Sequence, residues 1–419
     1  MPLRRRAALV AAAATTLTAL TAPIALADTT APAATTAAAP SRGDLYGTAD
    51  PTYDGVWRQS YAEIAVARSG YLAGGPATAW LLAQQCPDGG WPSYRKDTAK
   101  ACDPKTEDTN ATGIAIQALT LVQGPGSADA VSRAVRWLHS VQNADGGWSY
   151  NPGGPSDPDS TAVVIGALGR DASLARNAKG KSAYDALLGF QFGCDARPAD
   201  RGAFGYPGTD GKLTPNAKAT ADAIHFLAAG HLAGYAYPSP STPAVPPEPA
   251  DCTGNPKAYG ALDPNAAASA AAGWLLAQLR AGGGHLTAVT PGATTKTPDF
   301  GTTADAVIAL NALGRQGDTK ATSTWLGANS AAWSKGNPAA LAQLTLAGSD
   351  RYAPAGADAL PQLIALGPAP TKRPTGAISQ ADEKKDGSSG GTVWIIVGVV
   401  LVASAGVGLL ISGRKRRQS

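Results

Sequence analysis

The sequence predicts an all-α fold in which pairs of helices repeat around a closed ring. An eight-residue apolar phrase led by Thr occurs four times, at residues 112–119, 161–168, 220–227 and 303–310. Segments richer in Trp and Leu lie between the copies and run into Gly-rich turns. No useful stretch has the two-residue alternation of a half-buried strand. An internal repeat of this kind is typical of arrays of helical hairpins.

Each copy of the phrase is expected to begin a helix, because a side-chain acceptor stands at the N-cap position. The acceptors lie four residues before each Thr and are Asp108, Asp157, Asn216 and Asp299. Asp and Asn accept hydrogen bonds from the unpaired N–H groups of a first helical turn. Apolar spacing and caps together predict helices near 57–69, 76–85, 108–122, 128–142, 158–169, 181–190, 215–230, 264–280, 299–315, 319–328, 337–347 and 356–366.

The composition of the two helix types assigns them to two layers. The helices that begin with Thr are rich in Ala, Gly and Thr and can pack closely side by side, which suits an inner ring. The helices with Trp and Leu are bulkier and suit an outer layer. We therefore expect an α6/α6 toroid over residues 49–367, and an open helical solenoid is the alternative. A Pro-rich insertion at residues 236–263 is expected to lie over one mouth of the ring.

The two ends of the chain have the patterns of an export signal and a membrane anchor. Residues 1–27 combine three Arg residues with an apolar run and a small-residue end, which predicts a signal peptide. Residues 392–412 are apolar enough to cross a bilayer as one transmembrane helix, and residues 413–419 form a basic tail expected on the cytoplasmic side. A flexible linker at 28–48 and a stalk at 368–391 flank the folded part. We expect a single-pass protein of the cell membrane with its ectodomain outside the cell.

The charge distribution argues against a nucleic-acid partner. The formal charge of +4 includes three positive charges in the signal peptide and four in the tail, which leaves −3 for residues 28–411. Proteins that bind nucleic acid usually present a basic face instead.

The cysteines predict disulfides and no metal site. The four are Cys86, Cys102, Cys194 and Cys252, an even number in a chain expected to meet an oxidising exterior. Three pairings are possible. We expect Cys86 with Cys102 and Cys194 with Cys252, because each pair brackets one irregular loop. No CxxC or nearby histidine pattern supports metal binding.

Two segments share a pattern that runs from Gln to Trp. Residues 85–91 (QCPDGGW) and 142–148 (QNADGGW) both fit Gln-x3-Gly-x-Trp, and weaker copies begin at Gln191 and Gln278. The pattern resembles the QW motif of the squalene-hopene cyclase and protein prenyltransferase superfamily. This resemblance implies an α6/α6 toroid with a central cavity, in which the motif ties the outer helices together.

One further segment resembles the acid-bearing run of the cyclases in this superfamily. Residues 157–162 (DPDSTA) differ by Ser160 from the run D-x-D-D-T-A, and Asp159 stands where the cyclases keep their catalytic acid. The same repeat position holds Asn110, Lys218 and Gly301 elsewhere in the chain. The chain has only five Phe residues to stabilise carbocations. We therefore favour no catalytic residue and expect Asp159 to be an exposed or capping side chain at a helix N-terminus.

Other branches of the superfamily fit the sequence to different degrees. The prenyltransferases bind a zinc ion with Asp, Cys and His side chains. None of the four histidines of this chain occurs together with Asp and Cys in the pattern of that zinc site. His225 and His231, six residues apart, do not share a helix face as a zinc-binding pair would. The chain also resembles the corrinoid carriers, whose disulfide-stapled α6/α6 ring performs no chemistry, in its Asp-x3-Thr-Ala helix starts.

These observations favour a binding module over an enzyme. We expect a non-catalytic cell-surface protein that takes a small molecule or lipid, with a corrinoid as one candidate, and passes it to a membrane transporter; no cofactor is implied. Asp159, Tyr150 and Tyr206 are the expected ligand contacts. The alternative is an extracytoplasmic terpenoid cyclase acting on squalene or a polyprenyl lipid, with Asp159 as the acid. Glycan cleavage is a third option, but Asp222 and Asp305 recur at matched repeat positions, which favours a structural role.

Overall fold

The described residues of the computed structural model are mainly helical, as the sequence predicts. They are residues 43–169, 175–229, 252, 264–289, 295–348 and 358–373, and all of them belong to one compact unit. The expected helices are present with ends shifted by a few residues. The predicted signal peptide, transmembrane helix and basic tail lie outside the described residues, as do most of the linker, the stalk and the Pro-rich insertion.

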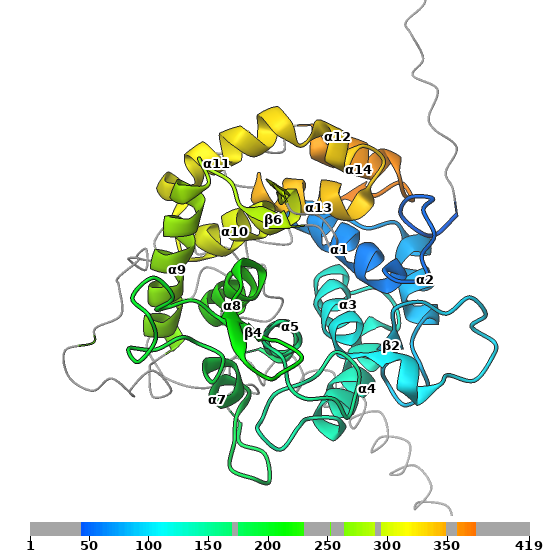
Figure 1. Cartoon of the computed structure of the whole chain (residues 1–419). Coiled ribbons are helices and arrows are strands. Elements are labelled where there is room, and N and C mark those ends of the chain that lie inside the picture. Colours follow the sequence, from blue (N-terminus) through cyan, green and yellow to red (C-terminus); the bar gives the residue numbers. More distant parts are fainter. Residues whose placement is uncertain are drawn as a thin grey trace, which may run out of the picture. The chain divides into compact units, whose positions relative to one another are not determined.

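Six helices, which we call the central helices, pack against one another in a closed cycle. Each one contacts the next in chain order, and the last contacts the first (Figure 1). They are α1 (Gly55–Arg68), α3 (Thr109–Val122), α5 (Pro158–Leu168), α8 (Ala217–Ala229), α10 (Phe300–Ala312) and α13 (Pro338–Ala347). Their buried faces are dominated by Ala, Ile, Val and Leu, which permits the close approach of neighbouring backbones.

A second set of helices packs around the central helices, one against each. The contacting pairs are α1 with α2, α3 with α4, α5 with α7, α8 with α9, α10 with α11 and α13 with α14. The outer helices are α2 (Gly75–Ala83), α4 (Ser127–Ser140), α7 (Ala183–Leu188), α9 (Pro264–Ala281), α11 (Gln316–Asn329) and α14 (Ala359–Ala365), and a short α12 (Ala331–Ser334) follows α11. In Figure 1 the outer helices flank the central ones on the side away from the middle of the molecule.

The strands are short antiparallel pairs that the sequence does not reveal. They are β1 (Tyr71–Leu72) with β8 (Thr371–Lys372), β2 (Trp91–Pro92) with β3 (Glu107–Asp108), β4 (Gly205–Pro207) with β5 (Leu213–Pro215), and β6 (Thr287–Val289) with β7 (Lys296–Pro298). Three of the pairs lie directly before a central helix. A strand of two or three residues is too short to show an alternating pattern.

The Thr of the repeated phrase links each central helix to the turn before it. Thr112 Oγ1 accepts a hydrogen bond from Trp91 N at 2.9 Å and donates one to Asp108 O at 2.8 Å. The equivalent backbone donors are Trp148 to Thr161, Phe204 to Thr220 and Leu286 to Thr303, at 2.9 to 3.1 Å. Each Thr is fully buried. A hydroxyl that both accepts and donates satisfies two backbone groups that would otherwise be buried without partners.

The predicted N-caps are confirmed. Asp108 Oδ1 accepts from Asn110 N and Ala111 N at the start of α3. The other three acceptors bind the amide three residues on: Asp157 to Ser160 N, Asn216 to Ala219 N and Asp299 to Thr302 N. The capping acceptor is thus a shared part of the repeat.

The residues of the QW-like motif hold the outer layer together, as the resemblance implies. Trp91 and Trp148 are fully buried, and their Nε1 atoms donate to Leu81 O and Leu138 O at 2.9 and 2.8 Å. Gln85 Nε2 donates to Ala130 O of the next outer helix at 2.9 Å. A Cβ at Gly89, which has a φ of +117°, would collide with the backbone of α4. The motif therefore joins the end of one outer helix to the side of the next.

Two disulfides close the loops that the sequence analysis selected. Cys86 is bonded to Cys102 and Cys194 to Cys252. The expected pairing is confirmed.

The packed structure reaches a few residues beyond both ends of the expected toroid range. Tyr46, within the predicted linker, is fully buried, and Gly47 N donates to Leu366 O at 2.9 Å. At the other end Arg373, within the predicted stalk, donates its backbone N–H to Gly70 O at 3.0 Å. Among the described helices none has the length and apolar character that a bilayer crossing requires.

Candidate functional site

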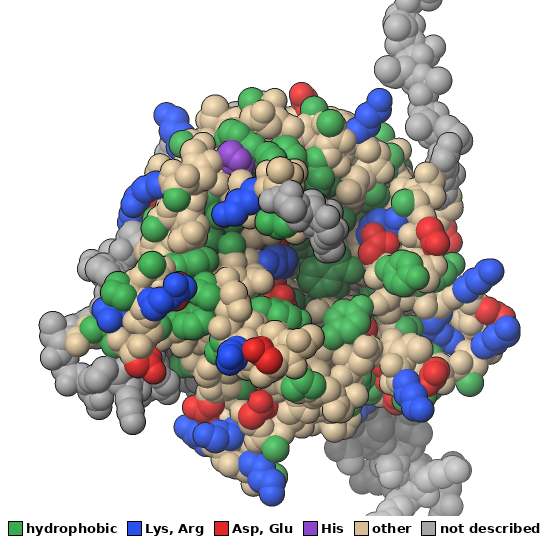
Figure 2. Space-filling view, in the orientation of Figure 1, with side chains coloured by type: hydrophobic (Ala, Val, Ile, Leu, Met, Phe, Trp, Pro, Cys, Tyr) green, Lys and Arg blue, Asp and Glu red, His purple; other side chains and the backbone are tan. Residues whose placement is uncertain are grey.

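A pocket lies between five of the six central helices. It has a volume of about 90 Å³ and is lined by residues of α1, α5, α8, α10 and α13. Figure 2 shows one face of the molecule. A hollow lies at the middle of this face, and atoms of basic and acidic side chains are visible within it. The lining residues are Trp57, Tyr61, Val163, Lys218, Ala221, Asp222, His225, Phe226, Asp305, Ile308, Ala339 and Gln343.

One face of α8 supplies the polar side of the pocket. Lys218, Asp222, His225 and Phe226 follow the i, i+4, i+7, i+8 spacing that places side chains on one side of a helix. Lys218 Nζ makes an ion pair with Asp222 Oδ2, one turn further along the helix. His231, the other histidine considered with His225 as a zinc ligand, lies outside the described residues, and this stripe was not predicted from the sequence.

Asp305 of α10 completes an ion-pair network with α8. Its Oδ2 atom lies 3.6 Å from Lys218 Nζ. Its Oδ1 atom accepts a hydrogen bond from Gln343 Nε2 of α13 at 2.7 Å. Lys218 therefore lies between two carboxylates from neighbouring central helices. Asp222 and Asp305 are buried, whereas 39% of the Lys218 side chain is exposed.

Asp159 joins the same group from the first turn of α5. The expectation that it is an exposed or capping side chain is wrong, because Asp157 caps the helix by accepting from Ser160 N at 2.8 Å and from Ser160 Oγ at 2.7 Å. Asp159 Oδ1 is buried without a hydrogen-bond partner in the described structure. The charges of Lys218, Asp157 and Asp305 act on its carboxyl group. Asp159 is not among the lining residues, but Val163, one helical turn further along α5, is, so Asp159 lies next to the pocket on the side of the α5 N-terminus. We call this side the mouth.

Burial and the crowding of carboxyl groups change the protonation of this cluster. Burial raises the pKa of Asp159 to about 6 and that of Asp222 to about 7, although Lys218 acts in the opposite direction on both. Burial opposes the charge of Lys218, but Asp222, Asp305 and Asp159 together raise its pKa. Lys218 is therefore an ammonium at neutral pH, and Asp159 and Asp222 exchange protons in the range where enzymes use general acids.

His225 is neutral at the inner end of the polar stripe. Burial, Lys218 and Arg68 lower its pKa to about 3. Its ring packs edge-on against Phe226, with ring centroids 4.7 Å apart.

Aromatic rings line two parts of the pocket. Trp57 and Tyr61 lie one turn apart on α1, across the pocket from α8, with ring centroids 6.0 Å apart. Phe226 is on α8 itself, next to His225 in the polar stripe. The faces of such rings attract positive charge. Neither Trp57 nor Tyr61 was predicted to line a pocket, because no motif in the sequence marks them.

The two expected tyrosine contacts lie outside the pocket lining. Tyr206 on β4 is 38% exposed, and its pKa is raised by burial and by the charges of Asp157 and Asp159, which places it near the mouth. Tyr150 is 45% exposed and its Oη atom lies 3.1 Å from Ser93 Oγ. The charge of Asp159 thus acts on Tyr206, whereas Tyr150 contacts Ser93, and a ligand-binding role for either tyrosine remains a prediction.

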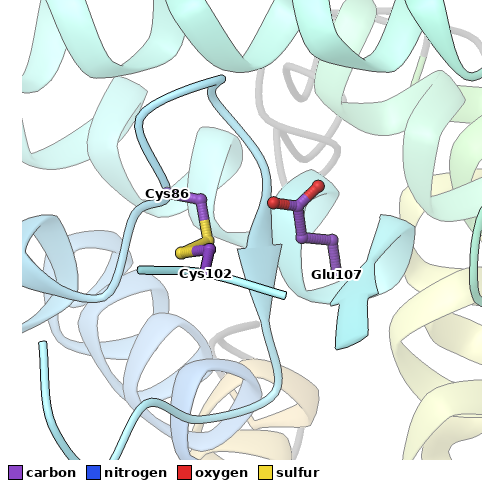
Figure 3. A group of neighbouring side chains, drawn as sticks. All are labelled: Cys86, Cys102 and Glu107. Carbon is purple, nitrogen blue, oxygen red and sulfur yellow. A yellow bond between two sulfur atoms is a disulfide. The ribbon is translucent and has the colours of Figure 1, made fainter. Parts of the chain in front are cut away.

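A second cluster surrounds the first disulfide. Cys86, Cys102 and Glu107 offer ligand atoms within 4.8 Å of one another, and Figure 3 shows the Glu107 carboxyl group beside the two sulfur atoms. The sulfur atoms are bonded to each other, so neither is a thiolate that binds a metal. Burial and the neighbouring Asp88 raise the pKa of Glu107 to about 7. We assign no metal to this cluster.

The repeat alignment contained the signal for the site. Lys218 occupies the same repeat position as Asp159, and Asp222 the same position as Asp305. Equivalent positions of neighbouring helices in a closed cycle lie at the same level, so charges at these positions meet at the centre. The sequence analysis treated this equivalence as evidence of a structural role alone.

Comparisons with known proteins point to one class of enzyme over limited segments. The chain is 50% identical over 56 residues to a drimenyl diphosphate synthase of Streptantibioticus cattleyicolor, covering 12% of this chain and 10% of that protein. It is 32% identical over 138 residues to a drimenyl diphosphate synthase of Streptomyces showdoensis, covering 22% of this chain and 26% of that protein. The chain thus matches about a quarter or less of each relative's length.

Two further comparisons assign neither a family nor a function to the chain. No family model matches the chain. A crystal structure of a protein from Actinoplanes is similar with 17% sequence identity and a TM-score of 0.38, covering 67% of this chain and 72% of that one. What the comparisons give is local sequence similarity to drimenyl diphosphate synthases.

Proposed function

We propose that the chain is an α6/α6 toroid of the terpene cyclase and prenyltransferase superfamily and acts as a terpenoid cyclase. The local similarity to drimenyl diphosphate synthases supports this, as do the buried bonds of the QW-like motif and the closed cycle of central helices. The observation that carries the proposal is the carboxyl group of Asp159, whose buried Oδ1 atom has no hydrogen-bond partner at the mouth of a pocket with aromatic walls.

The proposed reaction begins with proton transfer from Asp159. The protonated carboxyl group donates its proton to one carbon of an alkene, and the other carbon becomes a cation. The next double bond of the isoprenoid attacks this cation and closes a ring. Trp57, Tyr61 and Phe226 present ring faces to the positive charge. Loss of a proton from the final cation, either to water or to a carboxylate of the cluster, gives a neutral product and balances the reaction.

Several features of Asp159 suit a general acid. A pKa of about 6 keeps part of the population protonated near neutral pH. Lys218 is bound to Asp222 and lies beside Asp305, so Asp159 is the carboxyl group of the three without a direct ion pair in the described structure. Bound substrate would displace water from the mouth and raise the pKa of Asp159 further by desolvation.

The size of the pocket limits how a ligand is held. A volume of about 90 Å³ admits the end of a chain and is too small for a corrin macrocycle. An isoprenoid would place its reacting end in the pocket and extend the rest through the mouth, past Tyr206. A corrinoid ligand and a transporter partner have no support in the site and stay predictions from the sequence.

A non-catalytic binding module is the second candidate. Lys218 partly neutralises Asp222 and Asp305, and buried ion-pair networks of this kind also occur without catalysis. For either function we propose an exported location, with residues 392–412 as the anchor, because both disulfides need an oxidising compartment to persist.

The test is product formation by the wild-type protein and by Asp159→Asn. Purified protein would be incubated with squalene, farnesol and longer polyprenols, and extracts examined by gas chromatography with mass spectrometry. We expect cyclic isomers from the wild type and a loss of about 100-fold or more in rate for Asp159→Asn. Asp129→Asn, which changes an exposed carboxylate on the outer helix α4, serves as the matched control. An Asp159→Asn variant as active as the wild type would rule out the proposed acid, and no product from any substrate would favour the binding module.

A further inference from the structure

We infer that the central pocket accepts an isoprenoid without phosphate groups, as a hydrocarbon or an alcohol, and rejects prenyl diphosphates. The isoprenoid part of this statement rests on the proposed function. The exclusion of phosphate rests on the charges of the pocket, and it differs from what the names of the similar enzymes would suggest.

Acidic groups outnumber basic ones at the site. Asp222 and Asp305 line the pocket and Asp159 stands at its mouth, whereas Lys218 is the one cation among the lining residues. If one of the three carboxyl groups is protonated, two carboxylates still face one ammonium group. His225 adds no positive charge near neutral pH, because its pKa is lowered. The pocket is therefore negative, and a diphosphate with its own negative charges would be repelled.

The single ammonium group is already engaged. Lys218 Nζ is in contact with Asp222 Oδ2 and lies 3.6 Å from Asp305 Oδ2. Binding a phosphate would require it to leave two buried carboxylates without their counter-ion, which is costly. The amide nitrogen of Gln343 is also engaged, because it donates to Asp305. The ammonium and amide donors of the lining are thus already engaged with carboxylates.

The helix N-termini at the mouth are also occupied. Helix N-termini commonly bind phosphate through their unpaired N–H groups. Here Asp157, Asn216 and Asp299 accept from first-turn amides of α5, α8 and α10. Two of these caps are carboxylates, which add negative charge where a phosphate would have to lie. A feature that attracts phosphate in other proteins is used for capping in this one.

Charges beyond the lining do not reverse the balance. Arg68 at the end of α1 acts on His225 and helps to lower its pKa, but Asp157 in turn adds a negative charge that acts on Asp159. Lys212 stands in the turn between β4 and β5, but its side chain is 86% exposed and lies 3.8 Å from Asp210. An exposed lysine paired with its own aspartate contributes little to a buried site.

The same electrostatics favour a positive ligand. Carboxylates of α8 and α10 and the aromatic rings of Trp57 and Tyr61 on α1 line the same small cavity, an arrangement that stabilises an organic cation. In the proposed reaction this cation is the intermediate formed by protonation. A farnesyl amine, which is an ammonium ion at pH 7, imitates its charge and provides a probe for binding alone.

The experiment compares three ligands with the same fifteen-carbon tail. Binding of farnesyl dimethylamine, farnesol and farnesyl diphosphate to the wild-type protein at pH 7 would be measured by isothermal titration calorimetry. We expect affinity to fall in that order, with farnesyl diphosphate weaker than farnesol by about tenfold or more, as repulsion at short range in a partly buried site predicts.

Two variants test whether the carboxylates cause the preference. Each of the variants Asp222→Asn and Asp305→Asn keeps the shape of the side chain and removes one negative charge. The ratio of the affinities for farnesol and farnesyl diphosphate should therefore fall by about tenfold in each variant. Asp129→Asn on α4 should leave this ratio of affinities unchanged. Circular dichroism of each variant would verify that the helices are retained.

The outcomes separate the inference from the proposed function. If the affinity order holds and no cyclic product forms, the preference stands and the cyclase function fails. If farnesyl diphosphate binds most tightly, or the two Asn variants leave the order unchanged, the inference is wrong even where product is formed. If none of the three ligands binds up to its solubility limit, both the inference and the proposed function are contradicted.

Discussion

Lys218 controls the protonation of the carboxyl groups around it. Its ammonium group lowers the pKa of Asp159 and Asp222, while burial raises both above the usual value for an aspartate. The balance leaves two side chains that exchange protons near neutral pH in the middle of the central helices. At the scale of the residue, the site is thus defined by the partly buried ammonium group of Lys218 and by Asp159, the carboxyl group to which it is not directly paired.

The stability of the protein should depend on pH through Asp222. Its pKa is about 7 in the folded chain, whereas an aspartate in the unfolded chain has its ordinary pKa of 3.8, so the folded state holds a proton that the unfolded state releases. The stability that this proton contributes is complete below about pH 4 and is lost as pH rises through 7. We expect the free energy of unfolding to fall across this range, and to fall less steeply in Asp222→Asn. Urea denaturation at several pH values measures this free energy. If it changed with pH equally in the wild type and in Asp222→Asn, the raised pKa assigned to Asp222 would be contradicted.

The repeated phrase defines the central helix as the structural unit. Its Thr binds the preceding turn, and its Asp or Asn caps the first turn, so the two residues fix where the helix begins and how it joins the outer layer. The four copies repeat because four turns must be joined to four helices in the same way.

Loss of one such hydroxyl should destabilise the protein. Thr303→Val keeps the shape but removes the acceptor for Leu286 N and the donor to Asp299 O. Both backbone groups are then left without this partner in a buried site, and the free energy of unfolding should fall by about 1 to 3 kcal/mol. Thr324→Val on the exposed side of α11 is the control and should change it by less than about 0.5 kcal/mol. A Thr303→Val protein as stable as this control would show that the bond carries no net energy.

The sequence predicts the helices well and the site poorly, for a physical reason. Helix position depends on local signals such as the caps and the apolar period, and these can be read along the chain. The environment of the Asp159 carboxyl group depends on Lys218 and Asp305, which come from other helices. No local sequence pattern can therefore predict it. Trp57 and Tyr61 were missed likewise, because their role depends on which helix faces α1 across the pocket. The short strand pairs escape prediction since two residues carry no period.

At the scale of the whole molecule, the disulfides constrain the loops of an otherwise helical chain. The two bonds span 16 and 58 residues of sequence. In the chain-entropy model the disulfide that closes the longer loop stabilises the folded state more, because the unfolded chain loses more conformational entropy when distant residues are joined.

Removing each disulfide should therefore give unequal losses. We expect the double variant Cys194→Ser/Cys252→Ser to lose about 4 kcal/mol of unfolding free energy and Cys86→Ser/Cys102→Ser about 3 kcal/mol. Chemical denaturation of the wild type and the two variants measures both. Equal losses, or a larger loss from the shorter loop, would show that local packing, such as that around buried Glu107, outweighs chain entropy.

The junction between the first and last central helices has a kinetic consequence. α13 packs against α1, and β8 pairs with β1 at the same junction, so every helical hairpin has a neighbour on both sides. Linear repeat proteins fray from their outermost units, which have only one neighbour. The described part of this chain has no outermost unit, so we expect unfolding to begin by opening the cycle of helices, and the hydrogen bond from Gly47 N to Leu366 O is one of the contacts at the junction where it can open.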